Sequence, residues 1–247
     1  MLFSFIYYIM RMVNSMQYER LELLIGNKLE LIKNSKVLVL GLGGVGGFVT
    51  EALVRSGFGT IILVDNDDID ITNLNRQIIS NHSNIGNLKT EEWEKRIKTI
   101  NPNVNLIKIN KFIDYSNISE LFDLDFDYAI DACDTIMTKF LFIKNCLEKN
   151  KIFISCMGTG NKFKPDRLKV TTLDKTSYDP IAKKLRNLVK KEKLKGKIPV
   201  LYSDEVVNKI ESKSIPSSIF VPGTAGLMCA NYIFNCIVGE TNEKSNR

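Results

Sequence analysis

The sequence contains cysteine and histidine only in arrangements of little use for a metal site. Its cysteines stand at positions 133, 146, 156, 229 and 236, and no two of them form a C-x-x-C pair. An odd number without that spacing argues against a disulfide framework and a zinc knuckle, so we expect no zinc and a reducing, cytoplasmic setting. The one histidine, His82, belongs to none of the motifs below.

Long uninterrupted apolar runs are also missing. The first ten residues, MLFSFIYYIM, are apolar, but a membrane span needs about 20 residues and a secretory signal needs a basic start and a cleavage site. Residues 214–239 carry no charge, yet prolines and glycines interrupt them, which favours a buried helix starting after Pro222 over a membrane span. We expect a mobile extension at residues 1–17, with Met12 or Met16 as alternative starts, and a flexible tail at 241–247.

What remains suits one large domain. The 247 residues are 44% apolar, enough to bury a single core. Short β-branched runs, at 37–40, 61–64 and 152–154, alternate with longer amphipathic stretches. This alternation is typical of parallel strands joined by crossover helices. The sequence therefore predicts an α/β fold with a Rossmann-like, doubly wound, mostly parallel sheet, in a single domain over residues 18–240.

Positive charge is concentrated in one segment. The net charge is +6, whereas residues 181–200 alone hold eight basic residues and one acidic residue. A solvated helix face is the usual explanation of a charge run. Because this segment carries the whole basic excess, a polyanion such as RNA becomes a serious candidate partner. The expected RNA contacts are Lys183, Lys184, Arg186, Lys190 and Lys191.

A strand expected at residues 36–40 runs into a glycine-rich turn. The turn contains Gly41, Gly43, Gly44, Gly46 and Gly47. Three of them fit the pattern G-x-G-x-x-G ahead of a helix, which lets the backbone approach a phosphate at the helix N-terminus. The others remove side chains from the expected floor of the site. Asp65 ends the next strand, where a carboxylate accepts hydrogen bonds from ribose hydroxyls.

The loop after Asp65 distinguishes two kinds of nucleotide site. A dehydrogenase has no use for Asn73, Arg76 and Gln77 there, because the glycine turn already binds its pyrophosphate. Nucleotidyl transfer does need them, because negative charge accumulates on the phosphoryl oxygens and the leaving pyrophosphate. Arg76 can bind two oxygens as a fork, and Asn73 or Gln77 can add neutral donors. Lys89, which opens the following helix, supplies a point charge.

The stretch DACD, residues 131–134, follows another expected strand at 128–130. Asp134 then lies at the carboxyl edge of a parallel sheet, where it can hold Mg²⁺ on the phosphates, directly or through water. An N-cap for a helix at 135–147 explains the same residue equally well. We expect ATP and Mg²⁺ as cofactors, with Asp134 as the metal ligand.

These motifs together resemble the adenylating enzymes related to ubiquitin-activating enzyme. GxGGxG, D-x-D, N-x-N-R-Q, G-x-x-K and D-x-x-D occur in order, and the resemblance covers roughly residues 20–238. The resemblance implies contacts to ATP and magnesium by Gly44, Asp65, Asn73, Arg76, Lys89 and Asp134. It also implies a homodimer in which an arginine near the N-terminus reaches the partner's ATP; in the segment RLELLIG this is Arg20. A helix arm that packs Leu21, Leu24 and Ile25 on a neighbour is a plainer explanation, compatible with the first.

The second half resembles one branch of that family, the tRNA threonylcarbamoyladenosine dehydratases. Residues 155–191 resemble its glycine turn, strand and basic helix, residues 217–234 its closing helix, and VLYSDEVV its V-x-Y-S-x-E segment, apart from Asp204 and Val206. The cysteine pairs of sulfur-carrier adenylyltransferases are missing, and residues 157–228 contain no cysteine for thioester chemistry. We expect Cys156 and Cys229 to be core residues.

The branch implies ATP-dependent dehydration of N6-threonylcarbamoyladenosine next to the anticodon of tRNA. In the reaction that the resemblance implies, the threonyl carboxylate of this nucleoside attacks the α-phosphate of ATP. The charge is stabilised by Arg76, Lys89, Mg²⁺ bound to Asp134, and Arg20 of a partner. A nitrogen of the same side chain then closes a ring and expels AMP. A tethered nucleophile needs no enzyme thiol. A sulfur-relay protein or cysteine desulfurase is a further conceivable partner.

Aromatic residues that can stack an unpaired base are Phe163, Tyr178 and Tyr202, although such residues more often belong to a core or rim.

Two other functions stay open. One is an adenylyltransferase acting on the C-terminus of a ubiquitin-like sulfur-carrier protein, and the other is a nucleotide-binding or NAD-linked module without adenylation activity. Pyrophosphate exchange that depends on tRNA separates the first from the dehydratase, and preference for NAD over ATP identifies the second.

Overall fold

The computed structural model describes residues 16–206 and 214–239. The expected tail at 241–247 lies outside these ranges, as does the expected N-terminal extension apart from Met16 and Gln17, which are helical. The side-chain amide of Gln17 donates to the carbonyl of Ile100 at 3.0 Å. Gln17 is therefore attached to the body of the domain.

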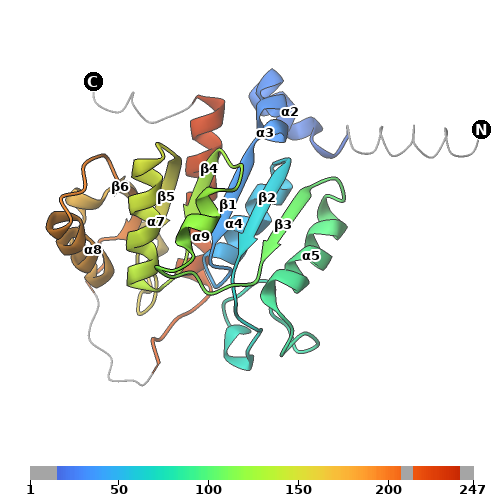
Figure 1. The fold of residues 1–247 in the computed structure, drawn as a ribbon. Helices are drawn as coiled ribbons and strands as arrows, with labels where there is room; N and C mark the ends of the chain where they lie inside the picture. The colour runs from blue at the N-terminus through green and yellow to red at the C-terminus, as the bar shows by residue number, and fades with distance from the viewer. Residues whose placement is uncertain (1–15, 207–213, 240–247) are drawn as a thin grey trace, which may run out of the picture.

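Within the described residues, seven strands form one sheet in the order β3-β2-β1-β4-β5-β7-β6 (Figure 1). The strands are β1 (Lys36–Leu40), β2 (Thr60–Val64), β3 (Asn105–Ile109), β4 (Tyr128–Asp131), β5 (Ile152–Cys156), β6 (Leu168–Thr172) and β7 (Pro199–Ser203). All neighbours pair in parallel except β6, which runs antiparallel to β7 at one edge. The doubly wound, mostly parallel sheet is confirmed. The order in which the chain adds strands reverses between β1 and β4: β2 and β3 lie on one side of β1, and β4 and β5 on the other. Ligand crevices form at the carboxyl ends of the strands at such a switch point.

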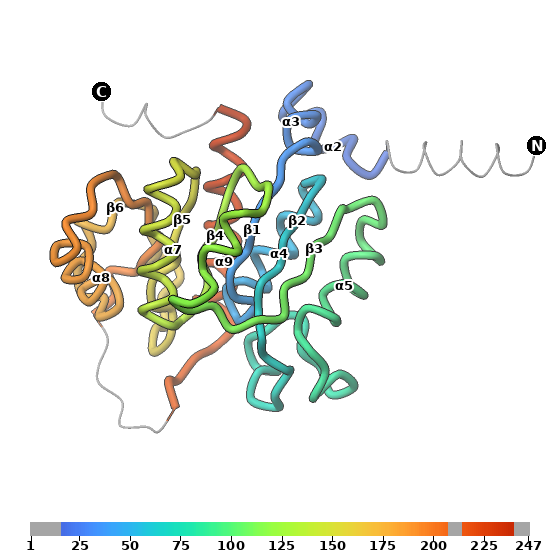
Figure 2. The backbone as a smooth tube through the Cα atoms, viewed as in Figure 1, coloured from blue at the N-terminus to red at the C-terminus, as the bar shows by residue number. Residues whose placement is uncertain are grey.

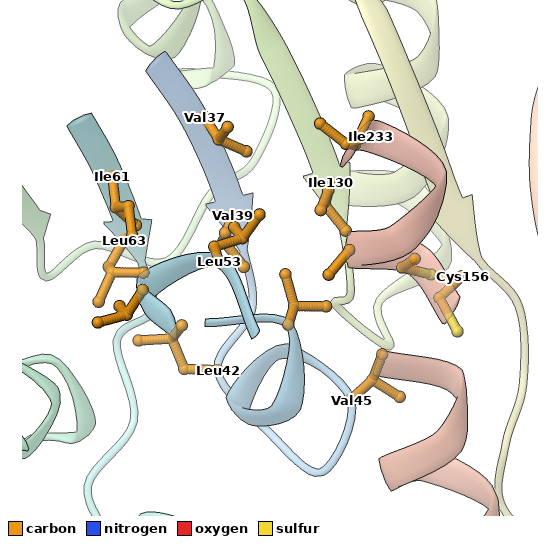
Figure 3. Close-up of a cluster of buried hydrophobic side chains, with 14 of the residues drawn as sticks. Val37, Val39, Leu42, Val45, Leu53, Ile61, Leu63, Ile130, Cys156 and Ile233 are labelled. Carbon is orange, nitrogen blue, oxygen red and sulfur yellow. The ribbon is translucent and has the colours of Figure 1, made fainter. Parts of the chain in front are cut away.

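Helices cover both faces of the sheet. The first face is covered by α3 (Leu29–Asn34), α4 (Gly46–Arg55), α5 (Lys89–Ile100) and α9 (Phe220–Val238), and the second by α6 (Ile118–Phe122), α7 (Ile136–Glu148) and α8 (Pro180–Lys191). In β1, Val37 and Val39 point to the first face and Leu38 and Leu40 to the second, the alternation of a strand buried on both sides. Figure 3 shows the cluster on the first face, and Figure 2 shows the backbone path of both layers.

Helix α9 begins at Phe220, two residues before Pro222, so its expected start after that proline was wrong. Proline is tolerated there because the first turn of a helix needs no intrahelical N–H bond. Among the described residues, α9 is the one helix long and apolar enough to cross a membrane, and half of that stretch is buried in the domain. Its closest approach is to α4, where a Cβ on Gly226 would lie 2.4 Å from the carbonyl oxygen of Val45. These contacts are those of a core helix.

A short arm precedes the sheet. Helix α2 (Glu19–Ile25) has no buried residue, and a turn of 3-10 helix connects it to α3. Because α3 ends directly before β1, this arm lies beyond the amino-terminal ends of the strands, at the top of Figure 1.

Candidate active site

A cavity of about 880 Å³ opens at the carboxyl ends of β1, β4 and β5. Sites for small molecules typically measure about 300–1,000 Å³, so this one is large. One wall consists of the glycine turn, the loop after β2, and residues 132–135; the other consists of residues 156–162, residues 179–181, Ile215 and Ser217. The first wall contains the residues expected to bind a nucleotide, and the second has room for another reactant.

The glycine turn lines the first wall through Gly41, Gly43 and Gly44. Gly41 has a φ of +90°, and a Cβ there would lie 2.8 Å from the backbone nitrogen of Cys133. Larger residues disfavour that φ and would push the turn away from β4. The expected contact of these glycines with a nucleotide fits the position of the turn at the N-terminus of α4.

The other two glycines serve packing. A Cβ on Gly46 would lie 1.7 Å from the carbonyl oxygen of Gly41, so Gly46 allows α4 to pack against its own turn. Gly47 faces Ile78 and Trp93, whose atoms would lie 3.2 and 3.5 Å from a Cβ. Neither glycine lines the cavity. The expectation that Gly47 lies on the floor of the site was therefore wrong.

Asp65 ties the glycine turn to β2. Its Oδ2 accepts the backbone N–H of Leu42 at 2.5 Å, and its Oδ1 accepts that of Asp67 at 2.8 Å. Burial raises the pKa of Asp65 above its ordinary value. The Lys89 ammonium, 3.9 Å from Oδ1, and the two backbone donors offset only part of this effect. A carboxylate has about four lone-pair sites, so Asp65 can still accept hydroxyl donors from the cavity.

The loop from residue 66 to residue 88 is closed at its base by a bridge between Asp68 and Leu88. The bridge delivers Lys89, the first residue of α5 as expected, to the cavity. Its ammonium donates to Asp67 at 2.7 Å, and the residue is only 3% exposed. A buried cation therefore faces the region where the phosphates are expected.

Asn73, Arg76 and Gln77 all line the cavity with donors to spare. Asn73 uses its carbonyl oxygen for the N–H of Asp70 at 3.1 Å. Arg76 uses one nitrogen, Nη1, for the carbonyl of Thr72 at 2.7 Å and for a neighbouring amide oxygen. Within the described ranges, the donors that have no partner are the amide nitrogen of Asn73 and Nε and Nη2 of Arg76. The buried Oε1 of Gln77, an acceptor, also has no partner there. The loop thus presents the unused donors that the motif predicts.

Asp134 lines the cavity and is exposed. The N-cap of α7 is Thr135, without a capping side-chain bond, so the explanation of Asp134 as an N-cap was wrong. In the part of the chain that is described, its carboxylate makes no hydrogen bond or ion pair, and no group of three or more His, Cys, Asp or Glu side chains is placed to hold a metal ion. Since Mg²⁺ usually binds one or two carboxylates, several waters and substrate phosphates, Asp134 fits it.

A buried ion pair below Asp134 was not found from the sequence. Lys139 Nζ lies 2.9 Å from Asp131 Oδ2 and donates to the carbonyl of Cys133 at 2.7 Å, and Ser155 donates to the same carboxylate at 2.5 Å. Burial alone lowers the pKa of Lys139, but the Asp131 carboxylate raises it above its ordinary value. The pair fixes the loop that carries Asp134. A lysine among the apolar residues of α7 was its only sequence signal.

The second wall contains another buried ion pair that was missed. Lys162 Nζ lies 3.0 Å from Asp179 Oδ2 and donates to the carbonyl of Gly158 at 2.6 Å. Asp179 Oδ1 also accepts the N–H of Ala182 at 2.9 Å and so caps α8. The signal was Asp followed by Pro at a helix start, a pattern typical of an N-cap.

The basic residues of α8 divide into two groups. Lys183, Lys184, Lys190 and Lys191 are exposed. Arg186 is half-buried and donates to the carbonyl of Thr176 at 3.1 Å. The lysines therefore suit contact with a polyanion better than Arg186, which was expected to join them.

Arg20 does not reach the cavity of its own chain. It is an exposed residue of α2, at the opposite end of the sheet (Figure 1). Of the arm residues expected to pack on a neighbour, Leu24 is 77% exposed, and Leu21 and Ile25 are half-buried. The adjacent Leu23 is 82% exposed, so the arm presents apolar side chains to solvent.

Cys156 and Cys229 are 3% and 0% exposed, which confirms them as core residues. Burial raises the pKa of the Cys229 thiol, and also that of Cys133, the other thiol beside Cys156 at the cavity. A raised pKa keeps the thiol protonated and unreactive near neutral pH.

Residues 15–247 match the model of the ThiF family. The tRNA threonylcarbamoyladenosine dehydratase of Bacillus subtilis is 42% identical over 88% of this chain and 92% of that protein. The crystal structure of Escherichia coli tRNA N6-threonylcarbamoyladenosine dehydratase in complex with ATP superimposes with a TM-score of 0.86 and 29% identity, covering 93% of this chain and 97% of that one. The adenylyltransferase and sulfurtransferase UBA4 of Vanderwaltozyma polyspora is 40% identical, but over 53% of this chain and 30% of that protein.

Proposed function

This chain belongs to the ThiF family, and we propose that it catalyses the ATP-dependent dehydration of N6-threonylcarbamoyladenosine in tRNA, next to the anticodon. One observation carries the proposal. A single cavity joins a wall of nucleotide-type donors to a second wall that leads into a basic helix and whose cysteine, Cys156, is a core residue only 3% exposed. The similarity to the dehydratases extends over both walls, whereas UBA4 matches about half of the chain.

The first step is adenylation of the threonyl carboxylate. An oxygen of the carboxylate attacks the α-phosphorus of ATP, the bond to the bridging oxygen of the β-phosphate breaks, and pyrophosphate leaves. The turn at Gly43 and Gly44 receives the phosphates, and Asp65 accepts the ribose hydroxyls. The free Nε and Nη2 of Arg76 and the ammonium of Lys89 stabilise the charge that develops.

The second step is closure of a ring. A nitrogen of the same side chain attacks the activated carbonyl carbon and loses its proton, and AMP departs with one oxygen of the former carboxylate. The net change is loss of water, driven by cleavage of ATP to AMP and pyrophosphate. Because the attacking nitrogen is already tethered to the carbonyl, its effective concentration is high without an enzyme thiol.

Mg²⁺ is part of the proposal, with Asp134 as the residue that holds it. When bound, the ion neutralises phosphate charge. The support is the exposed Asp134 carboxylate, which has no partner among the described residues and is fixed from below by the pair of Lys139 and Asp131. A cytoplasmic location and a sulfur-relay partner remain predictions from the sequence.

A homodimer is also proposed, with Arg20 acting on the partner's ATP. The support is the exposed apolar arm, in which Leu23 and Leu24 are 82% and 77% exposed. Apolar side chains that are exposed next to one another often mark a surface that another protein covers. A second copy of the chain is the partner that the resemblance implies.

The test combines cells and purified protein. Cells that lack the gene are expected to accumulate the uncyclised nucleoside, measured by mass spectrometry of digested tRNA. In vitro, Arg76→Ala and Asp134→Ala are expected to lower AMP formation with tRNA at least about 100-fold, the size of a lost transition-state contact. Asp125→Ala, an exposed acid (its side chain 82% exposed) that does not line the cavity, is the matched control and stays active.

Near-normal turnover of both site variants contradicts the site assignment. Pyrophosphate exchange supported by a small ubiquitin-like protein, and not by tRNA, favours the sulfur-carrier function instead. Circular dichroism and thermal melting of each variant exclude loss of fold as the reason for lost activity.

A further inference from the structure

Two exposed aromatic rings lie at the edge of the second wall, and neither has a role in the adenylation or the ring closure. Phe163 is 74% exposed and Tyr178 is 69% exposed. Tyr202, a third aromatic residue that the sequence offered for stacking, is 7% exposed and belongs to the core. Single exposed aromatics are common on protein surfaces, so the position of these two decides whether they matter.

Phe163 has an exposed ring on a fixed backbone. The preceding residue, Lys162, lines the cavity. The N–H of Phe163 donates to both oxygens of the Glu205 carboxylate, at 3.1 Å each, and the N–H of Lys164 donates to one of them at 3.0 Å. Glu205 is 8% exposed, so a buried carboxylate holds this loop while the ring remains in solvent.

Tyr178 has a backbone conformation that large residues rarely adopt. Its φ is +57°, in the left-handed region. Such a conformation is strained and persists where the surrounding structure enforces it, often at functional sites. The next residue, Asp179, lines the cavity and caps α8.

The two aromatic residues are neighbours of one buried ion pair. Lys162 precedes Phe163 and Asp179 follows Tyr178, and the side chains of Lys162 and Asp179, 3% and 0% exposed, meet at 3.0 Å. This pair therefore joins the two segments within the second wall of the cavity. In residues 16–206 and 214–239, neither ring packs on another aromatic ring. The exposed Lys183 and Lys184 follow in the first turns of α8.

We propose that Phe163 and Tyr178 form a stacking platform for the RNA base that carries the reacting side chain. This inference rests on the proposed function. A side chain that enters the cavity past Lys162 and Asp179 leaves its base at the rim, between the cavity and the lysines of α8. Proteins that read single-stranded RNA stack splayed bases on aromatic rings. The platform positions the base, and the lysines bind the phosphates beside it.

The test compares ring loss with ring retention at Tyr178. Tyr178→Asn removes the ring and tolerates the left-handed backbone, whereas Tyr178→Phe keeps the ring. We expect kcat/KM for tRNA to fall about tenfold in Tyr178→Asn and to stay within about twofold of wild type in Tyr178→Phe. Phe163→Ala is expected to behave like Tyr178→Asn. The Kd for ATP, measured without tRNA, is expected to stay unchanged in all three variants.

Tyr115→Ala is the matched control, because Tyr115 is 84% exposed and does not line the cavity. Wild-type kcat/KM in Tyr178→Asn, or an equal loss in Tyr178→Phe, overturns the platform. If wild-type protein forms cyclic nucleoside while the ring variants are normal, only the platform fails. If wild-type protein does not act on tRNA at all, the proposed function fails, and the platform with it.

A direct measurement of stacking uses Tyr178→Trp. The chain has one native tryptophan, Trp93, which is 0% exposed. Fluorescence from Trp at position 178 is expected to be quenched when an anticodon stem-loop that carries the modified adenosine is added. A stem-loop in which that nucleotide lacks its base is expected to quench the fluorescence much less. Equal quenching by both RNAs overturns the proposal.

Discussion

At the scale of single residues, the cavity contains charges that are already paired and donors that are not. Lys139 and Lys162 each meet a buried carboxylate, whereas Asp134 and part of the Arg76 guanidinium have no partner among the described residues. Paired, buried charges hold backbone in position, and unpaired ones near a cavity are available to a ligand. The two kinds of residue therefore have different mutational consequences.

Lys139→Met is expected to destabilise the fold by about 3–5 kcal/mol, because it leaves the Asp131 carboxylate buried without its cation. Urea denaturation measures the effect, and the double variant with Asp131→Asn is expected to regain part of the loss. Lys144→Met is the control on the same helix, since the pair of Lys144 and Glu148, 4.0 Å apart, is solvent-exposed. A Lys139→Met variant as stable as the control would show that the buried pair does not stabilise the loop.

The residues of the first wall were predictable from the sequence because each stands at the boundary of an element. Gly41 and Asp65 directly follow β1 and β2, Lys89 begins α5, and the parallel sheet brings these boundaries together. The pair of Lys162 and Asp179 was not predictable, because it depends on side chains of two loop segments turning inward. Gly46 and Gly47 fitted the motif, but only the packing of α4 distinguishes a contact with ligand from a contact with protein.

At the scale of elements, a charged contact fixes α4 against α5. The Glu51 carboxylate accepts from Arg96 at 2.6 and 2.9 Å and from Arg55 at 2.7 Å. Burial alone raises the pKa of Glu51, but the hydrogen bonds from Arg96 and Arg55 outweigh it and hold the pKa below its ordinary value of 4.5. The contact matters for the site because α4 carries the glycine turn and α5 begins with Lys89.

Glu51→Gln is expected to lower the Tm at about pH 7 and to reduce its dependence on pH. Because the folded pKa is lowered, the stabilisation is complete above the ordinary pKa and is lost as the pH falls through the folded value. The Tm difference from wild type is therefore expected to shrink between about pH 5 and pH 3. Glu30→Gln, which breaks only an exposed pair with Lys33, is the control with little effect. A difference that grows on acidification contradicts the assignment.

The elements themselves were largely predictable, since apolar β-branched runs at 37–40, 61–64 and 152–154 all lie in strands. The boundaries were less so. Helix α7 begins at Ile136 and α9 at Phe220, one residue later and three residues earlier than expected, because apolar periodicity indicates a helix without fixing its first residue. The antiparallel direction of β6 had no signal in the sequence, since it depends on how the connection after β5 folds back.

At the scale of the whole molecule, the cavity and the arm lie at opposite ends of the sheet. The cavity is at the carboxyl ends of the strands, and Arg20 belongs to a helix beyond their amino-terminal ends (Figures 1 and 2). If Arg20 acts on ATP, it does so in a second copy of the chain. The exposed Leu23 and Leu24 beside it are then interface residues, and in a two-fold dimer each arm faces the other protomer.

A mixing experiment tests this arrangement. Arg20→Ala and Asp134→Ala homodimers are each expected to be inactive, but a mixed dimer has one site with an intact Asp134 and an intact Arg20 from the partner. After random exchange of protomers, AMP formation is expected to return to about a quarter of the wild-type rate. Replacing Leu24 by Asp in both chains is expected to give monomers by light scattering and to abolish the recovery, because a buried apolar contact then carries a charge. Recovery by dilute, monomeric mixtures, or none in dimers that have exchanged, is incompatible with a site completed by the partner's Arg20.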